Sequence, residues 1–224
     1  MKKQAFADRY PYGIFSCIRT MGHIYKSRGN FDLSAQYYQE ALDYMLKNMP
    51  DQDPSQLYSS LAEYYRNTQK DYATALDYCE KALKSAKTER NIAQAMIEKC
   101  LILFRQGRID EFNDCYKEAV QMADRCKLSA NVSLLMAHIN KNILDKQYEQ
   151  AHAHADQLSE KGLQQHAYIY EYAKDYPNAI KYLKKYHQQL DSTNNLLQLS
   201  DIAELNTQIG AERLKMENIQ ATSR

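Results

Sequence analysis

Small and aromatic residues recur at helical spacing in three segments of the chain, residues 15–48, 55–88 and 160–190. Apolar positions in these segments fall three and four residues apart, which is the spacing of one face of an α-helix. Each segment reads as an amphipathic helix, a short polar turn, an aromatic residue and a second amphipathic helix. Small residues fall where the two helices must approach closely: Gly22, Ala62 and Ala167 in the first helix, Ala75 and Ala179 in the second. The pattern therefore predicts antiparallel helix pairs repeated along the chain.

The pattern is weaker between these segments. Residues 93–126 keep Gly107 and Tyr116, but Phe112 stands where a small residue is expected. In residues 130–160 the stretch from Tyr148 fits a second helix, whereas residues 131–144 have no secure register. We count five units, with residues 93–160 degenerate.

The repeated pattern resembles the tetratricopeptide repeat, a helix pair of about 34 residues. The resemblance implies an all-α fold, a tetratricopeptide-repeat α-solenoid in which antiparallel helix pairs form a right-handed superhelix. Stacking buries apolar faces that one pair could not bury alone. We expect a stub or the end of a preceding repeat in residues 1–14, about five repeats in residues 15–190, and a C-terminal capping helix with a charged extension in residues 191–224. The unit at residues 55–88 has one extra residue in its turn.

A solenoid of this kind has a concave groove that is lined by the first helix of each pair. Side chains there are not needed for the core, so they are free to bind a protein or a peptide. By helical spacing the groove positions are Arg19, His23, Lys26, Gln56, Glu63, Arg66, Tyr168, Glu171 and Tyr172. The predicted surface is mixed in sign, with tyrosines toward the C-terminal end, and aromatic side chains give large contact area for recognition.

Composition narrows the classes of function. Lys and Arg total 29 against 28 Asp and Glu, so the net charge is +1 and argues against nucleic-acid binding through this region. Mean hydropathy is −0.70, and no stretch reaches the roughly 18 apolar residues that a membrane-spanning helix needs. The 6 Gly and 4 Pro are too few for an all-β fold.

Catalytic and metal-binding chemistry finds no support in the sequence. There is no Gly-x-Ser-x-Gly, no Gly-rich loop and no Cys-x-x-Cys. His152 and His154 are two residues apart on a predicted helix and point away from each other, so we expect one exposed and one packed histidine. We expect no catalytic residues, no metal and no cofactor, and therefore no enzyme.

The five cysteines are an odd, irregular set that does not suggest a disulfide framework. We expect them to be small buried apolar residues, with Cys79 and Cys100 in interhelical seams. The full set is Cys17, Cys79, Cys100, Cys115 and Cys126.

The C-terminal residues carry a narrower resemblance. Residues 190–192, 202–207 and 212–218 are similar to the end of the sensor region of bacterial membrane-bound histidine kinases and helix-turn-helix regulators. In those proteins the repeats lie outside the inner membrane, and a charged helix leads to a transmembrane segment and an output module. The resemblance implies a non-catalytic sensor or scaffold in bacterial signal transduction, such as a two-component system, on the periplasmic side. A free-standing cytosolic adaptor that binds a peptide or partner protein in its groove remains the alternative.

The apolar stripe of the last helix thins along its length. Residues 190–193 suggest a helix stop, and Leu196 to Leu205 should dock on the final repeat. Beyond Ile209 polar residues dominate, and an isolated helix of this length is marginal in water. The distal part should fray, pack on a second copy to form a homodimer, or continue into a further domain.

Overall fold

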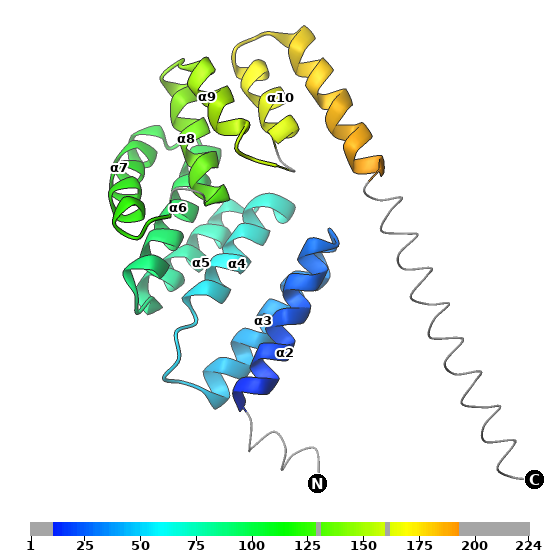
Figure 1. Cartoon of the computed structure of the whole chain (residues 1–224). Helices are drawn as coiled ribbons and strands as arrows, with labels where there is room; N and C mark the ends of the chain where they lie inside the picture. Colours follow the sequence, from blue (N-terminus) through cyan, green and yellow to red (C-terminus); the bar gives the residue numbers. More distant parts are fainter. Residues whose placement is uncertain (1–10, 129–130, 160–161, 193–224) are drawn as a thin grey trace, which may run out of the picture. The chain divides into compact units, whose positions relative to one another are not determined.

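The regular structure that the computed structural model describes is entirely helical, which confirms the all-α prediction (Figure 1). The described residues are 11–128, 131–159 and 162–192. They form two compact units that divide after Gly162, and each is described by itself. The helices are α2 (Pro11–Ser27), α3 (Phe31–Asn48), α4 (Ser55–Tyr64), the π-helical turn η1 (Tyr65–Gln69), α5 (Tyr72–Ser85), α6 (Glu89–Arg105), α7 (Ile109–Arg125), α8 (Val132–Leu144), α9 (Tyr148–Ala155), α10 (Gly162–Tyr172) and a helix from residue 176 to the last described residue, 192.

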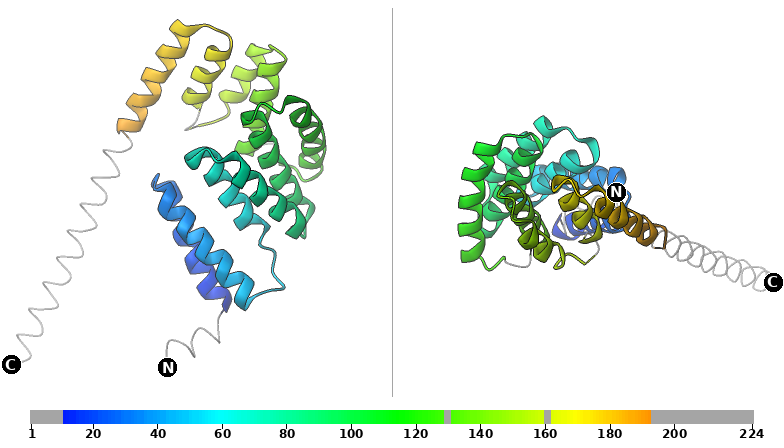
Figure 2. Two further views of the ribbon diagram at one scale, coloured as in Figure 1. Left: turned by 180° about the vertical axis from the view of Figure 1, so that it is seen from behind. Right: turned by 90° about the horizontal axis from the view of Figure 1, so that it is seen from above.

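Four helix pairs build the first unit: α2 with α3, α4 with α5, α6 with α7, and α8 with α9. Successive pairs also touch, because α3 contacts α4 and α5 contacts α6 (Figure 2). The first helices contact one another as well, α4 with α6 and α6 with α8. This contact between first helices brings side chains from distant repeats onto one face.

The same turn joins the two helices of every pair. One residue with a positive φ ends the first helix, and the next residue donates its N–H to a carbonyl in the last turn of that helix, which closes a Schellman-type cap. Glycine takes the left-handed position twice and lysine three times: Gly29, Lys70, Gly107, Lys146 and Lys174. The corresponding hydrogen bonds are Asn30 to Tyr25, Asp71 to Tyr65, Arg108 to Leu103, Gln147 to Asn142 and Asp175 to Tyr170, each 2.8–3.0 Å.

The extra residue of the second repeat is absorbed by a π-helical turn. In four of the turns the closing hydrogen bond spans five residues, but from Asp71 to Tyr65 it spans six. The intervening residues 65–69 form η1, and such single π-turns are often found at functional sites. The insertion thus widens the end of α4 without changing the turn that follows.

Gly22 permits the closest contact between α2 and α3. A Cβ atom at this position would lie 2.6 Å from Cε1 of Tyr38, which is far inside van der Waals distance. The Ser34 hydroxyl also donates to the Gly22 carbonyl over 2.8 Å. The predicted role of Gly22 as a close-contact residue is confirmed, and the contact fixes the Tyr38 ring beneath the surface.

The degenerate repeats are nevertheless well packed. Phe112, which stands where a small residue was expected, is fully buried, and its ring packs edge-on against Phe104. Residues 131–144, which had no secure register, contain α8, and Asn131 caps it by accepting from the N–H of Leu134 over 3.1 Å. Phe112 is therefore a core residue, and residues 131–144 supply a regular capped helix.

In the second unit, Tyr182 packs between two aromatic side chains of α10, His166 and Tyr170, with ring centroids 5.0 and 5.4 Å away. Asp175 caps the second helix by accepting from the N–H of Asn178. Residues 191 and 192 are still helical, where the sequence suggested a helix stop. The expected docking of Leu196 to Leu205, like the distal helix, lies outside the described residues.

The predicted N-terminal stub lies mostly outside the described residues too. Only residues 11–14 are described, and they already belong to α2, which begins at Pro11. Within the described residues, no helix is both long enough and apolar enough to cross a membrane.

Candidate functional site

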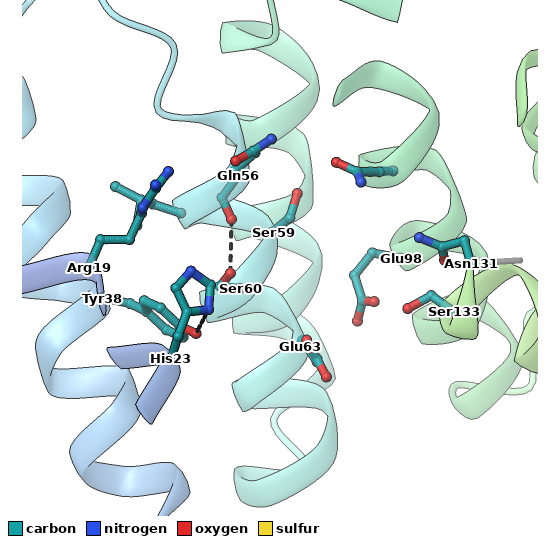
Figure 3. Close-up of a pocket in the computed structure, with 12 residues that line it drawn as sticks. Arg19, His23, Tyr38, Gln56, Ser59, Ser60, Glu63, Glu98, Asn131 and Ser133 are labelled. Carbon is teal, nitrogen blue, oxygen red and sulfur yellow. Dashed lines mark hydrogen bonds between the residues drawn. The ribbon is translucent and has the colours of Figure 1, made fainter. Parts of the chain in front are cut away.

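A cavity of about 270 Å³ opens in the first unit where the first helices of its pairs meet. Figure 3 shows Arg19, His23 and Tyr38 on one side, side chains of α4 in the middle, and Glu98, Asn131 and Ser133 on the other side. The lining thus draws on four repeats. It comprises Arg19 and His23 of α2, Tyr38 of α3, Gln56, Leu57, Ser59, Ser60 and Glu63 of α4, Gln94 and Glu98 of α6, and Asn131 and Ser133 at the start of α8.

The α2 wall is built around a hydrogen bond between Tyr38 and His23. The Tyr38 side chain is buried, and its hydroxyl lies 3.0 Å from Nδ1 of His23. Burial, together with the nearby Arg19 and Lys26 charges, lowers the pKa of His23 below its ordinary value. The imidazole is therefore neutral at physiological pH and contributes no charge to this wall.

Both acidic side chains of the cavity are neutralised by basic partners. Nζ of Lys26 lies 2.5 Å from Oε2 of Glu63, which joins α2 to α4. Nε of Arg66 lies 2.5 Å from Oε1 of Glu98, and Nη2 of Arg66 lies 3.3 Å from Oε2, which joins η1 to α6. Each carboxylate therefore brings little net charge to the cavity.

Arg19 is the remaining charged group. Its guanidinium lies over the Phe15 ring, with Cζ 5.4 Å from the ring centroid, and it forms no ion pair with any residue in the described part of the chain. Its Nε is shielded from solvent and has no hydrogen-bond partner there. The cavity thus presents an uncompensated positive charge on the α2 side.

Neutral polar side chains complete the lining. Gln56, Ser59, Ser60, Gln94, Asn131 and Ser133 supply amide and hydroxyl groups, which both donate and accept hydrogen bonds. Asn131 uses its carbonyl oxygen to cap α8, so its amide N–H groups stay free of that bond. Such a surface matches the alternating N–H and C=O groups of an extended peptide.

The structure brings together four of the predicted groove residues, Arg19, His23, Gln56 and Glu63. Lys26 adjoins the cavity through its ion pair with Glu63. Arg66 needs a correction, because it is not a free groove side chain. It is only 4% exposed and lies beneath the surface, where the π-turn that begins at Tyr65 sets it against Glu98.

The three remaining predicted residues belong to the second unit. The hydroxyls of Tyr168 and Tyr172 lie 3.5 Å apart on α10, and their ring centroids are 4.9 Å apart. Tyr172 and Glu171 are exposed. These three side chains therefore belong to the second unit, and the cavity is a feature of the first.

Several lining residues are absent from the predicted groove set, among them Tyr38, Leu57, Asn131 and Ser133. Tyr38 belongs to a second helix and is core by its burial, yet its hydroxyl reaches the cavity. The sequence signal for Tyr38 was Gly22, which lets α2 and α3 approach closely and so brings the Tyr38 side chain near the α2 wall. Asn131 stands just before an apolar run, which is typical of a helix N-cap and could have placed the start of α8.

The two neighbouring histidines differ from the prediction, and so does one of the cysteines. His152 and His154 are both half-buried, rather than one exposed and one packed. The His154 ring stacks on His138 with centroids 4.9 Å apart, and His138 is bonded to the Tyr116 hydroxyl over 2.6 Å. The predicted burial of Cys79 and Cys100 is confirmed, but Cys17 is exposed.

Comparison with known proteins supports the repeat assignment. The sequence profile of the tetratricopeptide-repeat family matches residues 15–88, which contain most of α2 and all of α3, α4 and α5. The fold is that of tetratricopeptide repeats. A solved structure, BtubC (BKLC) from P. vanneervenii, superposes with a TM-score of 0.53 at 16% sequence identity, covering 86% of this chain and 87% of that one. No curated protein sequence matches the chain.

Tetratricopeptide repeats generally mediate contacts between proteins and are typically non-catalytic scaffolds.

Proposed function

We propose that the first unit binds an extended peptide segment carrying a carboxylate, with the carboxylate near Arg19. The observation that carries this proposal is the charge balance of the cavity. Glu63 and Glu98 are paired with Lys26 and Arg66, so Arg19 is left as the group that can attract an ion. A charge-assisted hydrogen bond from a guanidinium to a carboxylate is stronger than one between neutral groups.

The amide and hydroxyl side chains across α4, α6 and α8 support an extended backbone as the rest of the ligand. Leu57 adds an apolar side chain to the lining. The same carboxylate chemistry could come from an acidic side chain or from a peptide C-terminus, and the two sources are separated by comparing free-acid peptides with amidated ones.

An array of random 12-residue peptides, followed by fluorescence anisotropy with the best binder, tests the proposal. Ser59→Trp fills the middle of the cavity and should abolish binding, whereas Ala73→Trp, on the exposed side of α5, should not. Arg19→Gln should weaken binding roughly tenfold or more and remove the preference for Glu over Gln in the peptide. Lys84→Gln removes an exposed cation from α5 and is the matched control.

Binding that survives both Ser59→Trp and Arg19→Gln would contradict the proposal. Selected peptides that are basic, or that bind Arg19→Gln as tightly as the wild type, would also contradict it.

We also propose that this repeat region serves as the sensor or scaffold of a bacterial signalling protein on the periplasmic side of the inner membrane. The support is the sequence resemblance of residues 190–218. A change at the repeats would pass to an output module through the C-terminal helix. The alternative, a free-standing cytosolic adaptor, gives that helix no such role.

A chimera that joins residue 224 to a reporter kinase separates the two. In the sensor role, the selected peptide changes kinase output, and Ala211→Pro removes the response while Ala211→Leu preserves it. Output that ignores both the peptide and the proline excludes transmission through the helix. The peptide-binding assay remains interpretable in either case, because it measures only whether a peptide binds to the cavity of the first unit.

A further inference from the structure

Two cysteine side chains of the third repeat face each other across a helix pair. Sγ of Cys100, on α6, lies 2.9 Å from Sγ of Cys115, on α7. The Cys115 sulfur also lies 3.4 Å from the carbonyl oxygen of Met96. Cys17, Cys79 and Cys126 make no sulfur–sulfur contact within the described part of the chain. The Cys100–Cys115 pair is thus set apart from the other thiols by geometry.

We propose that Cys100 and Cys115 form a reversible oxidation site for a low-molecular-weight disulfide such as oxidised glutathione, and that the oxidised form ties α6 to α7 through a Cys100–Cys115 disulfide. The proposal is independent of the peptide-binding function. A disulfide between two helices of one hairpin needs their sulfur atoms close together, and here they are already in contact.

Exposure decides which thiol reacts first. Cys115 is half-buried, so solvent and a small disulfide reach it, while Cys100 is fully buried. The hydrogen bond from the Cys100 thiol lowers the pKa of Cys115, and the nearby Lys99 adds to this effect. The same hydrogen bond, together with burial, raises the pKa of Cys100. Cys115 is therefore the attacking thiolate and Cys100 the resolving thiol.

The reaction balances in two exchanges. The Cys115 thiolate attacks one sulfur of oxidised glutathione, forms a mixed disulfide and releases one glutathione thiolate. Cys100 then loses its proton and attacks the Cys115 sulfur, which forms the Cys100–Cys115 bond and releases the second glutathione thiolate. The two protons of the protein thiols end on the two released glutathione molecules. The protein is oxidised by two electrons and the glutathione disulfide is reduced by two.

The bond would constrain the hairpin that carries one side of the cavity. It joins two residues that are 15 positions apart and closes a loop through the turn at Gly107. Cross-linking a loop of this kind removes conformational freedom from the unfolded chain, so it stabilises the folded one. α6 also holds Gln94 and Glu98 in the cavity wall. The oxidised form should therefore keep this wall folded under conditions in which the reduced form opens.

Peptide mapping of the full chain tests the proposal directly. The reduced protein is incubated with oxidised glutathione, alkylated under native conditions and digested with trypsin. We expect residues 100–105 cross-linked to residues 109–117, with a mass about 2 Da below the sum of the two reduced peptides. Cys115→Ser should abolish the cross-link, whereas Cys126→Ser, which changes another half-buried thiol, should leave it intact. Dithiothreitol should restore both peptides.

A second measurement needs no variant. The urea midpoint of the wild-type protein should rise on oxidation and return on reduction. The proposal is overturned if the two peptides are recovered separately, if glutathione stays bound to Cys115 as a mixed disulfide, or if the urea midpoint does not change.

Discussion

The guanidinium of Arg66 and the carboxylate of Glu98 form a two-pronged ion pair beneath the cavity, with N–O distances of 2.5 and 3.3 Å. Arg66 is 4% exposed and Glu98 is 5% exposed, so both charges are removed from water. Burial raises the pKa of Glu98, and the Arg66 charge opposes that shift. The pair joins the second repeat to the third at the π-turn that follows α4.

Removing one partner of this ion pair should destabilise the protein strongly. Arg66→Met leaves the Glu98 carboxylate buried without its counter-charge, and the free energy of unfolding should fall by about 3–5 kcal/mol. The double variant Arg66→Met with Glu98→Met should recover most of this loss, because neither charge then remains. Urea denaturation followed by circular dichroism measures both.

The Lys26–Glu63 ion pair provides a matched control. Its side chains are 40% and 25% exposed, so solvent screens the pair. Lys26→Met should therefore change the free energy of unfolding by less than about 1 kcal/mol. If Arg66→Met and Lys26→Met lower the free energy of unfolding by the same amount, burial does not determine how much each ion pair contributes.

Gly22→Ala should destabilise the first repeat. The added methyl would lie 2.6–2.7 Å from the Tyr38 ring, so the ring must move and its bond to His23 must lengthen. We expect a loss of about 1–3 kcal/mol from overpacking, although alanine has the better helix propensity. Thermal unfolding measures the change, and a melting temperature at or above that of the wild type would contradict the packing.

Stability should fall as the pH falls from about 7 to about 5. Burial lowers the pKa of His23, His138 and His154 from the ordinary value of 6.5. In this window the unfolded chain therefore binds more protons than the folded one, and acid favours unfolding. His138→Gln should reduce the slope of stability against pH. Urea midpoints measured across the window test this, and a flat profile would contradict it.

The repeats could be predicted from sequence because their signals are local. Gly22 and Ala62 mark close contacts, and the helical spacing around them shows which face is buried. Phe112 and the cap at Asn131 could not be placed in the same way. A large residue at a small-residue position is acceptable only if its neighbours have moved apart, and that depends on the whole repeat.

The groove residues were harder to predict, because helical spacing shows on which side of a helix a side chain lies but not which residue it contacts. Arg19 and Gln56 lie where helical spacing places them. Arg66 does not, because one inserted residue becomes a π-turn beside it rather than lengthening the loop. The Cys100–Cys115 contact also depends on how two helices are set against each other, and no motif in either helix signals it.

We propose that the peptide lies against the first helices of the repeats. Site-specific photo-crosslinking tests it most directly, with a benzophenone amino acid placed at position 56 on α4 or at position 36 on α3. Both positions hold exposed glutamines, but only Gln56 lines the cavity. A bound peptide should crosslink from position 56 and not from position 36. Crosslinking from position 36, or from neither position while the peptide is bound, would contradict it.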